Sequence, residues 1–179
     1  MKKVSQFTYL ICLLSLILQS CESDKAIAPA DCNTVYVAVF GDIQYLTQNK
    51  TDVKVYKESV DWILRKKAEG CNINCVLYTG DITVTNAHYQ WKHFLNSTSQ
   101  LAREMPIIAM TGDHDYTWED GKHIADRNST HINEYMPSLS NTSKVVAWYE
   151  EGHYENIVVE NTIHGQRLDL FDLEFAPRE

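Results

Sequence analysis

The sequence lacks an excess of basic residues, because its 16 lysines and arginines are outnumbered by 24 aspartates and glutamates. The formal net charge is -8 at pH 7. Proteins that bind the backbone of nucleic acids need a basic face, so this charge argues against that class. A phosphorylated small molecule or a phosphodiester remains a possible substrate, since bound cations would reverse the local sign of the charge.

A second cysteine or histidine pair to accompany Cys71 and Cys75 is also lacking, which argues against a zinc site at these cysteines. Cys12 and Cys21 fall in the N-terminal leader described below. Two interpretations of the remaining cysteines are therefore possible: one disulfide among Cys32, Cys71 and Cys75, or a set of buried thiols. Low-complexity tracts are absent, and a content of 44% hydrophobic residues is that of a soluble globular domain.

The N-terminus lacks an apolar run long enough to span a bilayer, because its apolar core covers only about Tyr9–Leu18. Two lysines precede this core, as in a signal peptide. Leu18-Gln-Ser-Cys21 resembles a bacterial lipobox. We therefore expect residues 1–20 to be a signal peptide, Cys21 to be the lipidated mature N-terminus, and residues 21–33 to be a tether. The protein would be exported to the bacterial cell envelope, in contact with the membrane only through its lipid anchor, or simply secreted.

Three segments share one design, in which an apolar run of strand length ends in Gly and is followed by Asp. They are Val35-Tyr-Val-Ala-Val-Phe-Gly-Asp42-Ile-Gln44, Cys75-Val-Leu-Tyr-Thr-Gly-Asp81-Ile-Thr83 and Pro106-Ile-Ile-Ala-Met-Thr-Gly-Asp113-His114-Asp115. Such runs, separated by amphipathic segments, predict buried parallel strands of an α/β fold. Ligands bind at the carboxyl ends of such strands, so the three carboxylates are expected along one edge. They would repel one another there, and a pair of metal ions would offset the repulsion.

The rest of the chain predicts the following elements. Helices are expected from Thr51 or Asp52 to Gly70, from Asn86 to Arg103, and from Ser129 or Thr130 to Pro137. Irregular loops are expected at Tyr45–Lys50 and Tyr116–Asn128. Three strand-like runs then predict an antiparallel meander with a turn at 150–152, at Lys144–Tyr149, His153–Glu160 and Arg167–Phe175. Three tryptophans are expected in the core, namely Trp62, Trp91 and Trp148.

The strand ends offer the oxygen and nitrogen ligands that a two-metal phosphoesterase site requires. The expected metal ligands are Asp42, Gln44, Asp81 as the bridge, and Asp113. A hydroxide between the metals would attack phosphorus in line, and His114 would stabilise the transferring oxygens or protonate the leaving group. Asp115 would hold the His114 imidazole in one tautomer.

The blocks Gly41-Asp42-Ile-Gln44, Gly80-Asp81-Ile-Thr83 and Gly112-Asp113-His114-Asp115 resemble the first three motifs of the calcineurin-like metallophosphoesterases, and Leu173-Glu-Phe-Ala-Pro-Arg178 is similar to a strand end in bacterial secreted members. The resemblance covers the chain from Val35 onward. It implies a four-layer α/β/β/α sandwich, two divalent metal ions (Mn, Fe or Zn), and hydrolysis of phosphate mono- or diesters.

The sequence departs from the family pattern in three ways. Gln44 stands where His is usual, and Asp113 stands where Asn is usual. The later His and the Gly-His-x-His motif are not found in the 179 residues. We therefore expect residues 34–179 to be a C-terminally incomplete domain, truncated after the first part of the second sheet. His153 and His164 are the candidates to replace the missing imidazoles.

Two alternatives stay open. The chain could be an inactive remnant that binds one metal weakly. It could also be an exported binding module whose loops at 45–50 and 116–128 recognise a phosphorylated or glycan ligand. Of the other candidates, His88 lies near the site and could touch the substrate, Trp118 could line a substrate pocket, and His131 is interpreted as a loop or cap residue.

Overall fold

The computed structural model describes residues 34–124, 127–139 and 144–174. All of them belong to one compact unit, Asp31–Glu179. The expected signal peptide, the lipidation of Cys21 and the tether lie outside the described residues. Within the described part of the chain, no helix has the length and apolar character needed to cross a membrane.

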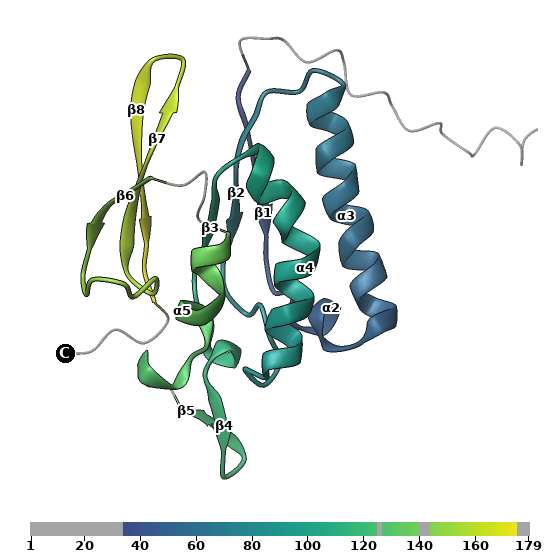
Figure 1. Cartoon of the computed structure of the whole chain (residues 1–179), viewed down its shortest axis with the longest axis vertical. Helices are drawn as coiled ribbons and strands as arrows, with labels where there is room; N and C mark the ends of the chain where they lie inside the picture. Colours follow the sequence, from purple (N-terminus) through teal and green to yellow (C-terminus); the bar gives the residue numbers. More distant parts are fainter. Residues whose placement is uncertain (1–33, 125–126, 140–143, 175–179) are drawn as a thin grey trace, which may run out of the picture. The chain divides into compact units, whose positions relative to one another are not determined.

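The first half of the described chain is a parallel sheet with crossover helices, as predicted. The sheet has the order β1-β2-β3, with β1 at Tyr36–Phe40, β2 at Ile73–Tyr78 and β3 at Ile107–Ala109. The crossovers contain α3 at Lys50–Ala68 and α4 at His88–Glu104. Figure 1 shows these two helices side by side along the sheet. The mixed α/β class is therefore confirmed, and the specific four-layer sandwich remains a prediction.

The predicted loop at Tyr45–Lys50 is wrong, because Gln44–Gln48 forms the short helix α2 and Lys50 begins α3. The buried Thr47 hydroxyl donates to the Ile82 carbonyl at 2.7 Å, which fixes α2 against the loop after β2. Asn49, rather than Thr51 or Asp52, caps α3: its side chain accepts from the backbone N–H groups of both those residues. At the other end of α3, Gly70 takes a φ of +100°, as the predicted helix stop requires.

The core lies between the helices and the sheet. The Tyr56 hydroxyl on α3 donates to the Tyr78 hydroxyl on β2 at 2.8 Å and lies 2.6 Å from that of Thr98 on α4. Trp91 is fully buried, as predicted. Trp62 is 45% exposed, so its predicted core position is wrong. The inward face of α3 is taken instead by residues such as Val60 and Ile63.

The predicted irregular loop at Tyr116–Asn128 is also wrong, because it contains a hairpin. Strand β4, Thr117–Glu119, pairs antiparallel with β5, Lys122–Ile124. The two residues between them, Asp120 and Gly121, have φ values of +48° and +77°. This is the conformation that an Asp-Gly pair adopts in a two-residue hairpin turn.

The second half ends in the predicted antiparallel meander. Its order is β6-β7-β8, with β6 at Lys144–Trp148, β7 at Ile157–Ile163 and β8 at Gln166–Asp172. The tight turn lies at His164-Gly165, between β7 and β8, while the predicted turn at 150–152 is part of a longer connection. Short elements precede the meander: the 3-10 turns Asp113–Asp115, Arg127–Ser129 and Met136–Ser138, and helix α5, Ile132–Tyr135.

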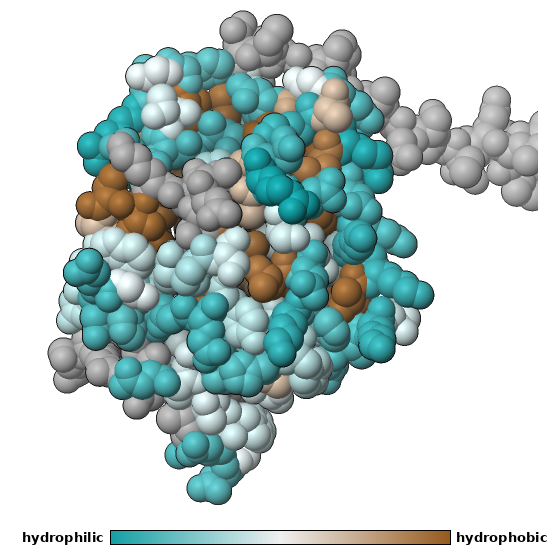
Figure 2. Space-filling view, in the orientation of Figure 1, coloured by the Kyte–Doolittle hydropathy of each residue, from teal (hydrophilic) through white to brown (hydrophobic). Residues whose placement is uncertain are grey.

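Several large apolar side chains remain exposed on the described part of the chain. On the face drawn in Figure 2, hydrophobic side chains reach the surface in separate places among hydrophilic ones. Val39 on the edge strand β1 is 59% exposed, and Phe171 on β8 is 65% exposed. An edge strand with exposed apolar side chains is open to pairing with another chain.

Candidate functional site

The three expected aspartates follow the carboxyl ends of the three parallel strands. The ligand atoms of Asp81, Asp113 and His114 all lie within 4.8 Å of one another. The amide Nε2 of Gln44 donates to Asp81 Oδ2 at 3.3 Å. The Asp42 carboxylate is exposed and outside this group, but it is near enough to act electrostatically on Asp81. The structure therefore brings together four of the six residues predicted for the strand ends, namely Gln44, Asp81, Asp113 and His114, with Asp42 at their margin.

Two glycines allow the strand ends to approach closely. Gly80 has a φ of +100°, and a Cβ there would lie 2.6 Å from the backbone N of Gly112. A Cβ on Gly112 would lie 2.1 Å from Asp81 Oδ1. Asp81 itself has a φ of +50° and accepts a hydrogen bond from the His114 backbone N–H at 3.2 Å. The Gly-Asp pairs that mark the sequence are thus needed for the loops after β2 and β3 to touch.

Carboxylates close to one another repel at this site. Burial is the main cause that raises the pKa of Asp81, and the carboxylates of Asp113 and Asp42 raise it further. The backbone hydrogen bond from His114 and its imidazole lower this pKa, and Gln44 Nε2 donates to the same carboxylate. A cation at this place would reverse the balance, since it would favour the ionised form of each carboxylate.

The buried side chain of Gln44 supplies a test of whether a metal fits. Gln44 is 7% exposed, and its Oε1 has no hydrogen-bond partner among the residues that the structure describes, whereas its Nε2 donates to Asp81. An orphaned buried oxygen beside carboxylates and an imidazole is a donor set suited to a hard or borderline divalent ion. The residues therefore fit a divalent metal. They supply one compact group of three ligands rather than two complete sets.

The structure differs from the predicted role of Asp115. His114 Nδ1 lies 2.9 Å from the Val84 carbonyl, so this carbonyl is what orients the imidazole. The fully buried Asp115 carboxylate accepts hydrogen bonds from the backbone N–H groups of Ile82, Thr83 and Gly112 and from the Thr83 hydroxyl. Burial raises its pKa to about 6 although these bonds lower it. Asp115 ties the loop after β2 to the loop after β3.

The candidates for the missing imidazoles lie elsewhere. His153 Nδ1 is 3.7 Å from Glu155, and its Nε2 is 3.7 Å from Glu150. His164 occupies the turn between β7 and β8. Neither belongs to the group formed at the strand ends in the described part of the chain. Trp118 lies on β4 and is 49% exposed, outside that group as well.

Sequence reasoning missed a set of buried carboxylates in the second half of the chain, namely Glu155, Asp172 and Glu174. Within the described ranges, both oxygens of Asp172 lack a hydrogen-bond partner, and so does one oxygen of Glu155. Burial, and then the charge of Glu155, raise the pKa of Asp172 well above its ordinary value. The strand pattern did not predict that these carboxylates are buried, because acidic residues normally lie on the solvent-exposed face of a strand.

These carboxylates predict a stability that falls as pH rises. The folded-state pKa of Asp172 lies above its unfolded value, so its contribution is complete below about pH 4 and is lost as pH rises through the folded-state pKa. We expect Asp172→Asn to be more stable than the parent at pH 8, by about 1–3 kcal/mol in the free energy of unfolding. Urea unfolding at pH 5 and pH 8 measures this.

The matched control is Asp169→Asn, on the same strand, where the carboxylate pairs with Arg167 at 2.7 Å and is partly exposed. Because this carboxylate is paired, its substitution should not raise the stability at pH 8. An Asp172→Asn variant with the parent's pH profile would contradict the prediction.

No protein-family model matches the chain, and no curated protein matches it. The resemblance to the calcineurin-like phosphoesterases therefore stays a prediction from the three sequence motifs.

Proposed function

We propose that the strand ends form the metal centre of a calcineurin-like phosphoesterase, which hydrolyses phosphate mono- or diesters with two divalent ions of Mn, Fe or Zn. One observation supports this most: carboxylate oxygens of Asp81 and Asp113, which would hold the ions, and a ring nitrogen of His114, which would face the substrate, come from two separate loops and lie within 4.8 Å of one another. The orphaned Oε1 of Gln44 beside Asp81 adds a further ligand atom.

Each residue of the site has a role in this proposal. Asp42, Gln44, Asp81 and Asp113 would hold the ions, with Asp81 between them. Bound ions would polarise the phosphoryl oxygens and acidify water. A carbonyl can only accept, so His114 Nδ1 carries the proton in its contact with Val84, and Nε2 is left to face the substrate. In its protonated form, Nε2 would donate to a phosphoryl oxygen or to the leaving group.

A second candidate function is binding of a single ion without turnover. It is favoured by the position of Asp42, which is exposed and outside the compact ligand group. Export, with a lipid anchor on Cys21, remains a prediction in either case. The substrate would be a phosphorylated small molecule or a phosphodiester.

Asp81→Asn tests the proposed function. We expect the full chain, supplied with Mn²⁺, to hydrolyse a generic aryl phosphate diester, and the variant to lose at least about 100-fold in turnover because a charged ligand is removed. Metal content per chain, measured by elemental analysis, should fall in parallel. The matched control is Asp120→Asn, which removes the same charge at another aspartate of positive φ, in the β4–β5 turn.

The three outcomes are distinct. Turnover that depends on Asp81 supports the phosphoesterase. Metal that depends on Asp81 without turnover supports the single-ion candidate. A parent chain that neither binds metal at Asp81 nor hydrolyses the ester overturns both.

A further inference from the structure

We propose that His88, His131 and Glu134 form a second metal site, which binds one Zn²⁺ ion. The ligand atoms of these three side chains lie within 4.8 Å of one another, in a group distinct from that of the strand ends. His88 is the first residue of α4, whereas His131 and Glu134 lie at the start of α5. The proposal does not depend on the phosphoesterase function.

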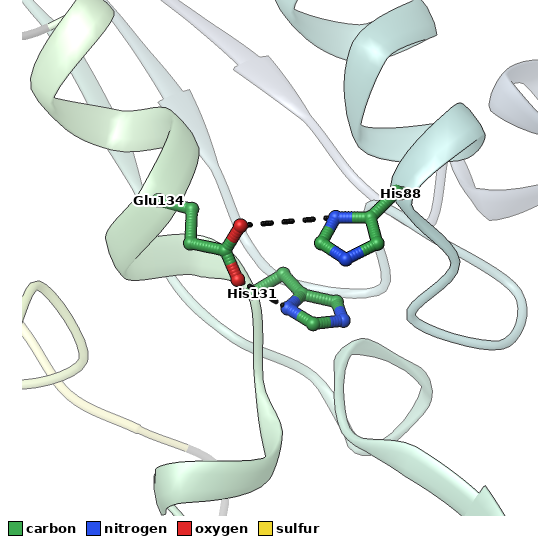
Figure 3. Close-up of side chains that lie close together, drawn as sticks. All are labelled: His88, His131 and Glu134. Atoms are coloured by element: carbon green, nitrogen blue, oxygen red, sulfur yellow. Dashed lines mark hydrogen bonds and ion pairs between the residues drawn. The ribbon is translucent and has the colours of Figure 1, made fainter.

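The three side chains already face one another. Figure 3 shows both imidazoles directed at the carboxylate of Glu134. His131 Nδ1 lies 2.6 Å from Glu134 Oε1, and His88 Nδ1 lies 3.8 Å from Glu134 Oε2. The two rings stack with their centroids 3.9 Å apart. Two imidazoles and one carboxylate, with a position open to water, are a ligand set that zinc takes in proteins.

The backbone of this group is held in place by a buried asparagine. Asn86 Oδ1 accepts from the His131 backbone N–H at 3.1 Å and from Trp91 Nε1 at 2.7 Å. Asn86 Nδ2 also donates to the Ser129 carbonyl. Asn86 is 3% exposed and has a φ of +54°. One side chain therefore joins the start of α4 to the segment that carries His131.

A tyrosine supports the first imidazole. The Tyr135 hydroxyl lies 3.0 Å from His88 Nδ1 and donates to the His88 carbonyl at 3.3 Å. Because its one proton goes to that carbonyl, the hydroxyl accepts from the Nδ1–H of His88, and the lone pair open to an ion is on Nε2. A partner on one ring nitrogen fixes the tautomer of a metal-binding imidazole in this way. The contact with Tyr135 thus places the ring of His88 on the side of α5.

Zinc would require a modest closure. Zinc bonds are about 2.0–2.2 Å long, and the ligand atoms around such an ion lie closer together than the 4.8 Å within which these three atoms now lie. The side chains of His88 and Glu134 are 55% and 56% exposed, so both can rotate without disturbing the core. The ion would replace the direct contact between His131 and Glu134. Its effect would be to tie α5 to α4.

Zinc titration of the Asp81→Asn chain tests this site alone, because that substitution disables the proposed strand-end site. We expect isothermal titration with Zn²⁺ to give one site per chain. His131→Ala and Glu134→Gln should each weaken that binding by at least about tenfold. The matched control is His164→Asn, which removes an exposed histidine from the β7–β8 turn, where Asn accepts the φ of +49°.

Co²⁺ supplies a second measurement that does not depend on stability. Bound at this site it should give the visible absorption of a tetrahedral centre, lost in His131→Ala, with unchanged far-UV circular dichroism showing that the variant is folded. No zinc binding by the Asp81→Asn chain would overturn the proposal. Equal binding by the parent, His131→Ala and Glu134→Gln would overturn it as well, since the three residues would then be only an exposed ion pair.

Discussion

Asp115→Ala should lower the free energy of unfolding by about 3–5 kcal/mol, among the largest effects of any single substitution in the chain. The carboxylate accepts from the backbone N–H groups of Ile82 at 3.1 Å, Thr83 at 2.8 Å and Gly112 at 3.0 Å. Ile82 and Thr83 are fully buried, so water cannot readily replace the lost acceptor. Each buried donor left without a partner costs about 1–3 kcal/mol, partly offset because a buried carboxylate is removed.

The measurement is urea unfolding followed by tryptophan fluorescence, because Trp91 is buried in the same unit. Asp113→Ala is the matched control, two residues away. Asp113 is part of the metal group and raises the pKa of Asp81, so its removal should leave stability unchanged or slightly higher while metal binding falls. A loss below about 1 kcal/mol in Asp115→Ala would show that the two loops hold together without this carboxylate.

The role of Asp115 also shows which features of the site the sequence predicts and which it does not. The three Gly-Asp motifs predicted the strands and their parallel direction, because strand-length apolar runs ending in glycine are typical of buried parallel strands. Of the three carboxylates expected together, Asp81 and Asp113 lie in one group and Asp42 lies outside it. The neighbour of His114 in sequence was an obvious partner for its imidazole. Only the fold shows that Val84 takes that place and that Asp115 turns inward to backbone donors.

The elements that were not predicted from the sequence were missed for different reasons. The β4–β5 hairpin could have been predicted, since Asp120-Gly121 is a strong turn signal between two short strands. Helix α2 could not, because its position depends on the contact of Thr47 with Ile82, far along the chain. The same limit applies to Asp172 and to the pairing of His88 with His131, which depend on packing between elements that are distant in sequence.

Gly80→Ala should be as damaging as Asp115→Ala, for a purely steric reason. A Cβ at Gly80 would lie 2.6 Å from the Gly112 backbone N and 2.9 Å from its Cα. Both contacts are with backbone, so relief requires the loops after β2 and β3 to separate. The φ of +100° adds strain for any residue with a Cβ. We expect a loss of about 3–4 kcal/mol in the free energy of unfolding, and weaker metal binding because Asp81 follows directly.

Two other glycines separate the steric cost of Gly80→Ala from its backbone strain. At Gly121 the φ is +77° but nothing lies within 4 Å of a Cβ, so Gly121→Ala should cost only the backbone strain of about 1–2 kcal/mol. At Gly41, in the first Gly-Asp motif, the nearest atom is 3.9 Å away and φ is not positive, so Gly41→Ala should be neutral or stabilising. Urea unfolding of the three variants measures the order of their losses in the free energy of unfolding. If Gly80→Ala cost no more than Gly121→Ala, the loops after β2 and β3 could part freely, and the close approach that brings Asp81 to Asp113 and His114 would not be a fixed property of the fold.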